Sequence, residues 1–158
     1  MHIVFSIVLY KTKKSVTSKI LNCIDKFKKI YSLENPRDFN VNTFVLDNFY
    51  QSDNTFKELK DNQKDVHYFK SKVNLGYGRG HNFNFSRINR VSEFIFIPIN
   101  PDIRFDPKEL SILIDFYIEN KNQIACLAPL IYFYDGKIQY SAKINPSIMR
   151  LLVSRFQI

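Results

Sequence analysis

Along this chain, short apolar runs typical of strands alternate with segments in which apolar residues recur at the spacing of a helix. The apolar run Ile3–Leu9 is typical of a buried strand. Behind it, apolar residues recur every three or four positions, a spacing that predicts an amphipathic helix. The residues on that helical stripe are Val16, Ile20, Ile24, Phe27 and Tyr31. The chain therefore opens with a strand–helix unit.

The same alternation continues through the rest of the chain. Strands are predicted over residues 41–46, 66–70, 94–99 and 124–128, a weak helix over 55–62 and further helices near 83–91 and from 106 onward. Asp106-Pro107 fits an N-cap followed by proline at the first helical position. Asp135-Gly136 favours a two-residue turn, so residues 131–134 and 138–140 are predicted to form a β-hairpin. Alternating strands and helices indicate an α/β fold with a largely parallel sheet.

Composition supports one globular domain over residues 1–158. Aliphatic and aromatic residues make up 45% and charged residues 24%, a globular profile rather than a disordered one. There is no run approaching about 20 apolar residues, and the first apolar segment is followed by lysines, so we expect a cytoplasmic protein. Cys23 and Cys126 lack metal-ligand spacing, and we expect both to be buried free thiols.

The formal charge is +8, and much of it lies in one segment. Between positions 11 and 29 the chain has seven lysines and one acidic residue, Asp25. The lysines are Lys11, Lys13, Lys14, Lys19, Lys26, Lys28 and Lys29. Such a face is either simply solvated or attracts nucleic acid, anionic lipid or a phosphorylated substrate. Because the 24 phenylalanines and tyrosines fall mostly at core positions and no nucleic-acid-binding motif occurs, we expect no nucleic-acid partner.

Three polar clusters fall where predicted strands end. They are Asp47-Asn48, the segment Asn74–Asn82 and Asn100-Pro101-Asp102. In open α/β sheets, ligands bind outside the carboxyl ends of the strands, so these clusters are candidates for one site. Each cluster taken alone also fits an ordinary turn, because asparagine and aspartate bond locally to the backbone.

The glycines of the second cluster lie at 76, 78 and 80, which does not fit the dinucleotide fingerprint Gly-x-Gly-x-x-Gly. A glycine-rich stretch leading into a helix can still bring backbone amides close to a nucleotide, although a flexible turn is the alternative. Asn100 and Asp102 supply the oxygen ligands that Mg²⁺ or Mn²⁺ accepts beside substrate phosphates. The alternative for them is again a turn.

The clusters in this order resemble family 2 glycosyltransferases, particularly the rhamnosyltransferase-like branch. The resemblance spans nearly the whole chain. Its residues are Ser6–Tyr10, Val45–Asn48, Asn74–Asn82, Phe96–Asp102, Ala128-Pro129, Asp135-Gly136, Gln139–Ser141 and Asn145–Ser147. It implies a GT-A fold, a mostly parallel Rossmann-like sheet flanked by helices, and this chain would be its nucleotide-sugar-binding portion.

The resemblance also implies roles for particular residues. Asp47 would contact the nucleobase, and Asp102 would bind a Mg or Mn divalent cation. The other residues implied in nucleotide binding are Ser6, Val8, Tyr10, Asn48, Asn74, Gly76, Gly78, Asn82 and Asn100.

The activity implied is inverting transfer of a sugar, rhamnose in that branch, from a nucleoside-diphosphate sugar to a glycan or lipid-linked acceptor in surface polysaccharide synthesis. The basic helix would then favour peripheral association with the inner face of the membrane. We also expect a homo-oligomer, because apolar side chains near the end of the chain need cover: Ile148, Leu151, Leu152, Val153 and Phe156.

The chain departs from the family pattern at several points. Phe49, Tyr50 and Gln51 replace a small residue and a serine after Asp-Asn, and Pro98 replaces an apolar residue with an N–H. Family members continue into an acceptor-binding segment with a Glu-Asp motif that holds the general base. We therefore expect a C-terminally truncated domain with no assignable catalytic residue. The alternative function is a catalytically inactive nucleotide-sugar-binding remnant or partner subunit.

Overall fold

The computed structural model describes residues 1–35, 39–49, 64–88 and 93–139. The chain divides into two compact units, Met1–Ile112 and Leu113–Ile158, and each is described by itself. The candidate site lies entirely in the first unit.

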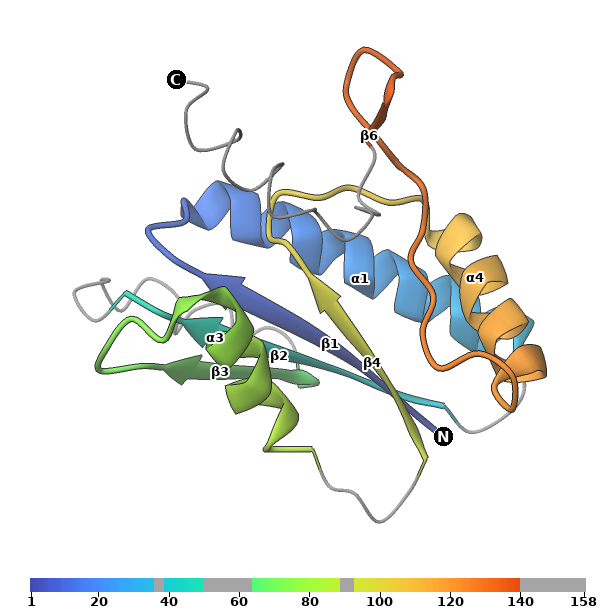
Figure 1. Ribbon diagram of the computed structural model, residues 1–158, viewed down its shortest axis with the longest axis horizontal. Coiled ribbons are helices and arrows are strands. Elements are labelled where there is room, and N and C mark those ends of the chain that lie inside the picture. The colour runs from blue at the N-terminus through green and yellow to red at the C-terminus, as the bar shows by residue number, and fades with distance from the viewer. Residues whose placement is uncertain (36–38, 50–63, 89–92, 140–158) are drawn as a thin grey trace, which may run out of the picture. The chain divides into compact units, whose positions relative to one another are not determined.

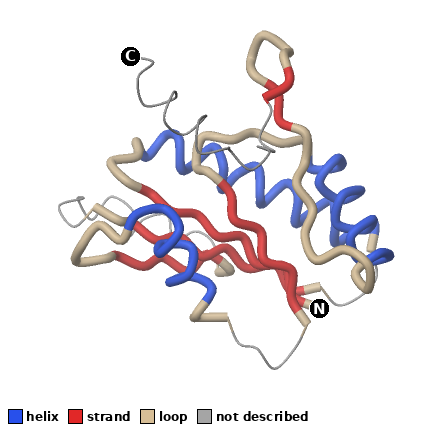
Figure 2. The backbone as a smooth tube through the Cα atoms, viewed as in Figure 1, coloured by secondary structure: helices blue, strands red, loops and turns tan. Residues whose placement is uncertain are grey.

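The first unit is built on a parallel four-stranded sheet in the order β3-β2-β1-β4 (Figures 1 and 2). The strands are β1 (His2–Leu9), β2 (Asn40–Asp47), β3 (Val66–Lys70) and β4 (Phe94–Ile99). In the register of the sheet, Leu9 pairs with Asp47, and Asp47 with Lys70. The carboxyl ends of β1, β2 and β3 therefore meet at one edge, as the α/β prediction required.

Helices cover both faces of this sheet because side chains of β1 alternate between two apolar layers. Phe5 packs against Phe27 of α1 (Lys14–Glu34), with ring centroids 5.6 Å apart. On the other face, α3 (Gly76–Phe85) lies over β1 and β2. The core on that face comprises Val4, Phe44 and Ile88, with Phe69, Phe85, Phe94 and Phe96 packed around them.

The start of α3 corrects one prediction. The glycine-rich segment was expected to be a loop that leads into a helix, but the helix already begins at Gly76. The Asn74 side chain accepts a hydrogen bond from the Gly76 amide at 2.9 Å, which holds the turn before the helix. Helical propensity is low here, so the helix depends on tertiary contacts described below.

Two further predictions concern β4 and the helix behind it. Asp106 caps α4 (Pro107–Asn120) through a 2.8 Å hydrogen bond from the Lys108 amide, which confirms the predicted N-cap. Pro98 lies in β4 opposite Ser6 of β1. β4 is an edge strand of the described sheet, and an edge tolerates a residue without an N–H.

The second unit contains a short hairpin of β5 (Ile131–Tyr132) and β6 (Ile138–Gln139). The Phe133 amide bonds to the Lys137 carbonyl at 2.8 Å, and Gly136 has φ of +79°. The hairpin loop is thus Tyr134–Gly136, one residue longer than the two-residue turn predicted, with glycine at its left-handed position.

The strand predicted over residues 124–128 is wrong. The Gln123 and Ile124 amides bond back to the Asn120 carbonyl, so this segment starts within the turn that ends α4 and continues as a loop. Cys126 is consequently exposed, which corrects the expectation of a buried thiol. Cys23 is half-buried and donates to the Phe105 carbonyl at 3.1 Å.

Some predictions lie outside the described residues. They concern the weak helix at 55–62, Tyr50 and Gln51, Val91, the end of the second hairpin strand at Tyr140, the resemblance at 140–147 and the apolar cluster from Ile148 to Phe156. Among the helices that the structure does describe, none is long and apolar enough to cross a membrane.

Candidate nucleotide site at the carboxyl ends of the strands

Asn48 joins the end of β2 to the start of α3. Its backbone amide donates to the Leu9 carbonyl at 2.8 Å, which keeps β1 and β2 together past their last paired residues. Its side chain donates to the Gly76 carbonyl at 3.0 Å and accepts from the Leu75 amide at 3.2 Å. Both ends of one amide are therefore used to fix the turn before α3.

Asp47 is almost fully buried, with 2% of its surface exposed. One carboxylate oxygen accepts from the Phe49 amide at 2.9 Å, and the other accepts from the Tyr68 hydroxyl at 2.8 Å. The carboxylate therefore holds the loop after β2 and ties it to β3. A buried carboxylate is stable only with such partners.

Ser6 lies in a buried polar network between β1 and α3. Its hydroxyl oxygen is 2.7 Å from His81 Nδ1 and 2.9 Å from Asn84 Nδ2. Asn84 also donates to the carbonyls of Ile7 and Phe44 at 3.3 and 3.2 Å. Ser6 and Asn84 are fully buried, so the predicted site residue Ser6 contributes to the fold through its side chain.

The network assigns the proton on His81. Asn84 Nδ2 is a donor, so among the described contacts of Ser6 only His81 Nδ1 can accept the hydroxyl hydrogen. Nδ1 is then unprotonated and the ring proton sits on Nε2, which is buried without a hydrogen-bond partner among the described groups. Burial lowers the pKa of His81 from its ordinary 6.5.

Acidification is expected to weaken the fold through His81. Because its folded pKa lies below the unfolded value, the unfolded chain binds a proton first as the pH falls below about 6.5, so stability is lost on acidification. The effect of one proton is at most about 1.4 kcal/mol for each pH unit. Urea unfolding of wild type and of His81→Asn at pH 7 and pH 5 measures it.

Asparagine is the matched variant for that experiment because its side-chain oxygen can accept the Ser6 hydroxyl hydrogen but does not titrate. The wild type should lose more stability than the variant between the two pH values. Equal losses in both proteins would show that His81 does not titrate in this range.

Val8 of β1 and Gly80 of α3 lie in close contact. A Cβ atom on Gly80 would lie 2.8 and 2.9 Å from the two methyl groups of Val8, and 3.4 Å from the Asn48 amide nitrogen. Val8 is 7% exposed. The predicted site residue Val8 therefore serves to seat α3, and Gly80 is required by packing.

Several predicted site residues are exposed around the start of α3. Asn74, Gly76 and Gly78 are exposed, and neither glycine has any neighbouring atom within 4 Å of where a Cβ would be. Gly76 has φ of +73°, a left-handed conformation that glycine adopts more easily than other residues, which explains why a glycine stands there. Nothing in the described structure explains Gly78, and space left open beside a helix N-terminus suits a close ligand. Asn82 is exposed one turn further along.

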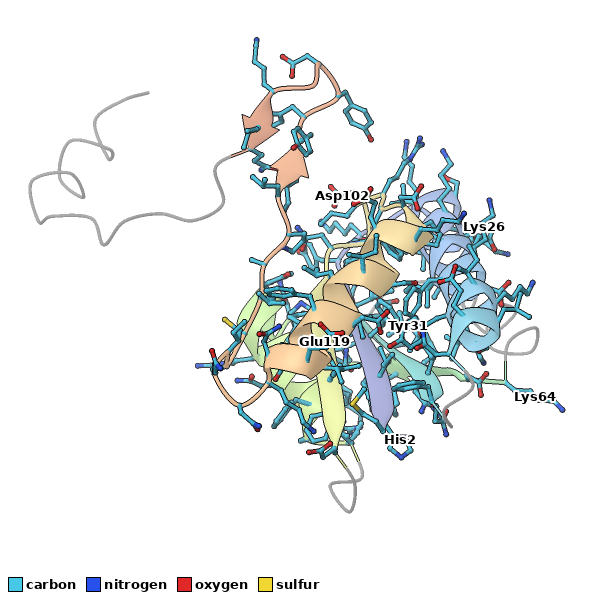
Figure 3. The ribbon with its side chains drawn as sticks, turned by 90° about the vertical axis from the view of Figure 1, so that its right-hand side faces the viewer. His2, Lys26, Tyr31, Lys64, Asp102 and Glu119 are labelled. Carbon is cyan, nitrogen blue, oxygen red and sulfur yellow. The ribbon has the colours of Figure 1, made fainter. Side chains whose placement is uncertain are left out.

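The end of β4 brings Asp102 to the same region. Burial and, secondly, the negative charge of Asp102 raise the pKa of Tyr77, in the first turn of α3. Figure 3 shows Asp102 at the opposite end of this unit from His2, the first residue of β1. Asn100 and Asp102 are exposed in a turn, where the Asn100 carbonyl accepts from the Ile103 amide at 3.4 Å.

The residues at this edge supply only some of the ligands that a bound cation needs. Within the described residues no three His, Cys, Asp or Glu side chains lie close enough to hold a metal ion. Asp102 supplies one exposed carboxylate. Mg²⁺ commonly takes one or two protein carboxylates and completes its shell with substrate phosphates and water, so Asp102 suits a substrate-borne cation and not a protein cage.

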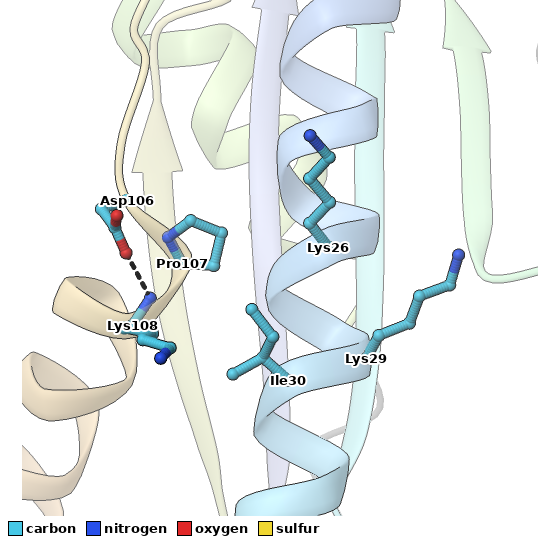
Figure 4. Close-up of a pocket in the computed structure, with 6 residues that line it drawn as sticks. All are labelled: Lys26, Lys29, Ile30, Asp106, Pro107 and Lys108. Carbon is cyan, nitrogen blue, oxygen red and sulfur yellow. Dashed lines mark hydrogen bonds between the residues drawn. The ribbon is translucent and has the colours of Figure 1, made fainter.

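A hollow lies away from the strand ends. It has a volume of about 390 Å³ and is lined by Lys26, Lys29, Ile30, Asp106, Pro107 and Lys108 (Figure 4). Lys26 and Lys29 lie roughly 20 Å along α1 from its first residue, at 1.5 Å per residue. None of the predicted site residues lines this pocket, although its lysines make it an alternative place for an anion.

Two lysines of the basic segment are paired. Lys28 forms an ion pair with Asp65, and Lys29 lies 2.8 Å from Asp25. Lys13, Lys19 and Lys26 are exposed on the same helix or just before it. The basic face is thus partly neutralised, and Lys13, Lys19 and Lys26 are exposed to solvent.

A parallel sheet with helices on both faces, with polar residues gathered at its carboxyl edge, defines an open α/β protein of the Rossmann-like, GT-A type. The chain belongs to glycosyl transferase family 2, whose sequence model matches residues 10–156. Searches among curated proteins and among solved structures gave no match.

Four residues of this region were not singled out from the sequence: Tyr68, Gly80 as a packing residue, His81 and Asn84. Their roles depend on partners 20 to 80 positions away in the chain, as in the pairs Tyr68–Asp47 and Asn84–Ser6. One signal was available. Polar Asn84 lies between Phe83 and Phe85 and close to apolar Ile88, which is unusual for a core-facing helix position unless its amide is satisfied.

Proposed function

We propose that this chain binds a nucleoside-diphosphate sugar and forms the donor-binding part of a glycosyltransferase. The observation that carries the proposal is the start of α3, where Asn48 fixes the backbone and Gly78 leaves open space beside the first amides. By its resemblance, the enzyme transfers rhamnose to a glycan or lipid-linked acceptor in surface polysaccharide synthesis.

The electrostatics of this edge suit a diphosphate. A helix N-terminus carries a partial positive charge and unpaired amides, both of which attract anionic oxygen. The first turn of α3 contains no acidic residue that would oppose this, and Arg79 adds a positive charge there. Asn74 and Gly76 then lie beside the nucleotide, Gly76 through the open space at its Cα because its amide already donates to Asn74, and Asn82 and Asn100 are exposed for hydrogen bonds.

Asp102 is proposed to bind the cation that accompanies the diphosphate. When bound, Mg²⁺ or Mn²⁺ offsets the negative charge that develops on the leaving diphosphate. This chain's contribution is to hold one carboxylate near Tyr77 at the end of β4. The single carboxylate makes cation binding dependent on the nucleotide.

Calorimetric titration with UDP and dTDP, with and without Mn²⁺, tests the proposal on wild type and Asp102→Ala. The wild type should bind a nucleoside diphosphate more tightly when Mn²⁺ is present. Asp102→Ala should lose that enhancement and keep its stability, because Asp102 is exposed. A folded wild type that binds neither nucleotide would refute the proposal.

A second function, an inactive nucleotide-sugar-binding remnant or partner subunit, is favoured by the state of two carboxylates. Asp106 caps α4, and Asp135 accepts hydrogen bonds from the Lys137 ammonium and, secondly, from the Lys137 backbone amide, which lower the Asp135 pKa. Both carboxylates are therefore engaged in local structural contacts. Donor binding without turnover, and turnover that appears when a second chain with an acceptor-binding segment is added, would identify this second function.

We also propose that the chain associates peripherally with anionic membrane, where lipid-linked acceptors lie. The support is the exposed lysines at and before α1, each contributing about 1 kcal/mol near an anionic surface. Sedimentation with phosphatidylglycerol vesicles at low and high salt is the test. Binding that is equal at both salt concentrations would contradict an electrostatic association.

A further inference from the structure

The hollow between α1 and the start of α4 has no part in the proposed donor site. Its volume of about 390 Å³ lies within the range of ligand pockets, about 300–1,000 Å³. Figure 4 shows that α1 supplies one wall and the first residues of α4 the other. The wall residues are Lys26, Lys29 and Ile30 on α1, and Asp106, Pro107 and Lys108 beside α4. Apolar and cationic groups therefore line the same small volume.

The apolar side chains in this lining are Ile30 and Pro107. Both are half-buried, so each leaves part of its apolar surface to solvent. Lysine side chains add their carbon stems to such a surface and keep the ammonium group in water at its rim. A ligand that fills the hollow therefore needs an apolar part.

Two of the three lysines have no ion-pair partner among the described residues. Lys29 lies 2.8 Å from Asp25, so its charge is paired. Lys26 and Lys108 are exposed, and neither forms an ion pair within the part of the chain that the structure describes. Asp106 is the one acidic residue in the lining, and its carboxylate accepts from the Lys108 amide at 2.8 Å. The lining is therefore net positive and suits an anion.

The backbone of the two walls favours a lipid over a peptide. The α1 residues of the lining lie inside a 21-residue helix, whose amides and carbonyls bond to one another. The Lys108 amide is taken by Asp106. A peptide backbone placed there would lose water from polar groups that find no partner, a cost that a phosphodiester on a hydrocarbon body does not have.

We propose that this hollow binds a single anionic phospholipid. Lys26 and Lys108 hold its phosphate, and its glycerol and first acyl carbons lie against Ile30 and Pro107. The inference deepens the proposed membrane association and rests on it for the source of the lipid. It assigns lipid binding to one site instead of a general attraction along α1.

The lipid site is separate from the donor site, so the two can be tested independently. None of the residues proposed to bind the donor lines the hollow. At the donor edge Tyr10 is 50% exposed, and its ring contacts that of Phe49 with centroids 5.9 Å apart. Substitutions at Lys26 and Lys108, which are exposed and lie outside this edge, should leave UDP binding unchanged.

Calorimetric titration with dihexanoyl-phosphatidylglycerol below its critical micelle concentration tests for a single-lipid site without a membrane surface. The full chain should bind this lipid and not dihexanoyl-phosphatidylcholine, whose headgroup has no net charge. The double variant Lys26→Gln, Lys108→Gln should bind the anionic lipid about tenfold more weakly, or weaker still.

The matched control is the double variant Lys13→Gln, Lys19→Gln, which removes the same charge near the start of the same helix. Its lipid affinity should change by less than about twofold, because these lysines lie about 10 to 20 Å from Lys26 along the helix, at or beyond the Debye length of ~10 Å. Both double variants should bind UDP as the wild type does.

Three results would overturn the lipid site. Equal weakening in the two double variants would show a diffuse attraction to the basic face. Equal affinity for glycerol 3-phosphate and for the lipid would show that the hollow takes a soluble phosphate. A wild type that binds UDP but not the lipid refutes this site and leaves the donor function standing, whereas one that binds the lipid but not UDP supports this site and refutes the donor function.

Discussion

Asn84→Asp is expected to destabilise the protein by about 3–5 kcal/mol at pH 7, the cost of an uncompensated buried charge. Asn84 is fully buried, and its amide nitrogen points at three oxygen atoms, those of Ser6, Ile7 and Phe44. A carboxylate has the same shape but offers no hydrogen to any of them. Urea unfolding followed by circular dichroism measures the difference.

The pH dependence and a second variant show whether the loss of stability comes from the buried charge. A buried carboxylate has a raised pKa, so protonation at pH 5 should reduce the deficit of Asn84→Asp relative to wild type. Asn84→Ala, which has no charge, should be more stable than Asn84→Asp at pH 7. If the aspartate variant unfolds within about 1 kcal/mol of wild type at pH 7, the amide does not have the role assigned to it.

Gly80→Ala and Gly78→Ala are expected to change stability in opposite directions. A Cβ at position 80 would lie 2.8 Å from a methyl group of Val8, which is buried and branched and cannot move aside, so we expect a loss of about 1–3 kcal/mol. A Cβ at position 78 meets nothing within 4 Å, and alanine favours the helix by about 0.5–1 kcal/mol. Thermal unfolding of the two variants compares them directly.

The same two variants separate packing from ligand binding. Gly78→Ala should weaken UDP binding in the presence of Mn²⁺ although it stabilises the protein, because its methyl group enters the space beside the first amides of α3. A variant that is more stable and binds UDP as well as wild type would remove Gly78 from the site. A stable Gly80→Ala would contradict the close approach of α3 to β1.

Much of the fold follows from local pattern. The four strands of the parallel sheet, α1 and the Asp106 cap of α4 lie where apolar spacing and capping residues predict them, because each is decided by neighbours in sequence. The start of α3 at Gly76 was not predictable in this way. Glycines disfavour a helix, and tertiary contacts stabilise it there, among them the two hydrogen bonds of the Asn48 side chain and the fit of Gly80 against Val8.

The sequence predicted which residues belong to the candidate site, and the structure shows that some of them are buried and others are exposed. The strand-end rule and the family resemblance together indicated the Asp47, Asn74–Asn82 and Asp102 clusters. Sequence alone could not show that Ser6, Val8 and Asp47 are buried, since their partners Asn84, Gly80 and Tyr68 come from distant segments. It likewise could not place Phe49 against Tyr10.

A crystal structure of the full chain with UDP and Mn²⁺ is the most direct test of the central claim, which is that the start of α3 and Asp102 hold a nucleoside diphosphate. We predict the diphosphate within hydrogen-bonding distance of the first amides of α3 and the cation on the Asp102 carboxylate. A diphosphate bound instead among Lys26, Lys29 and Lys108, in the pocket beside α1, would contradict the account.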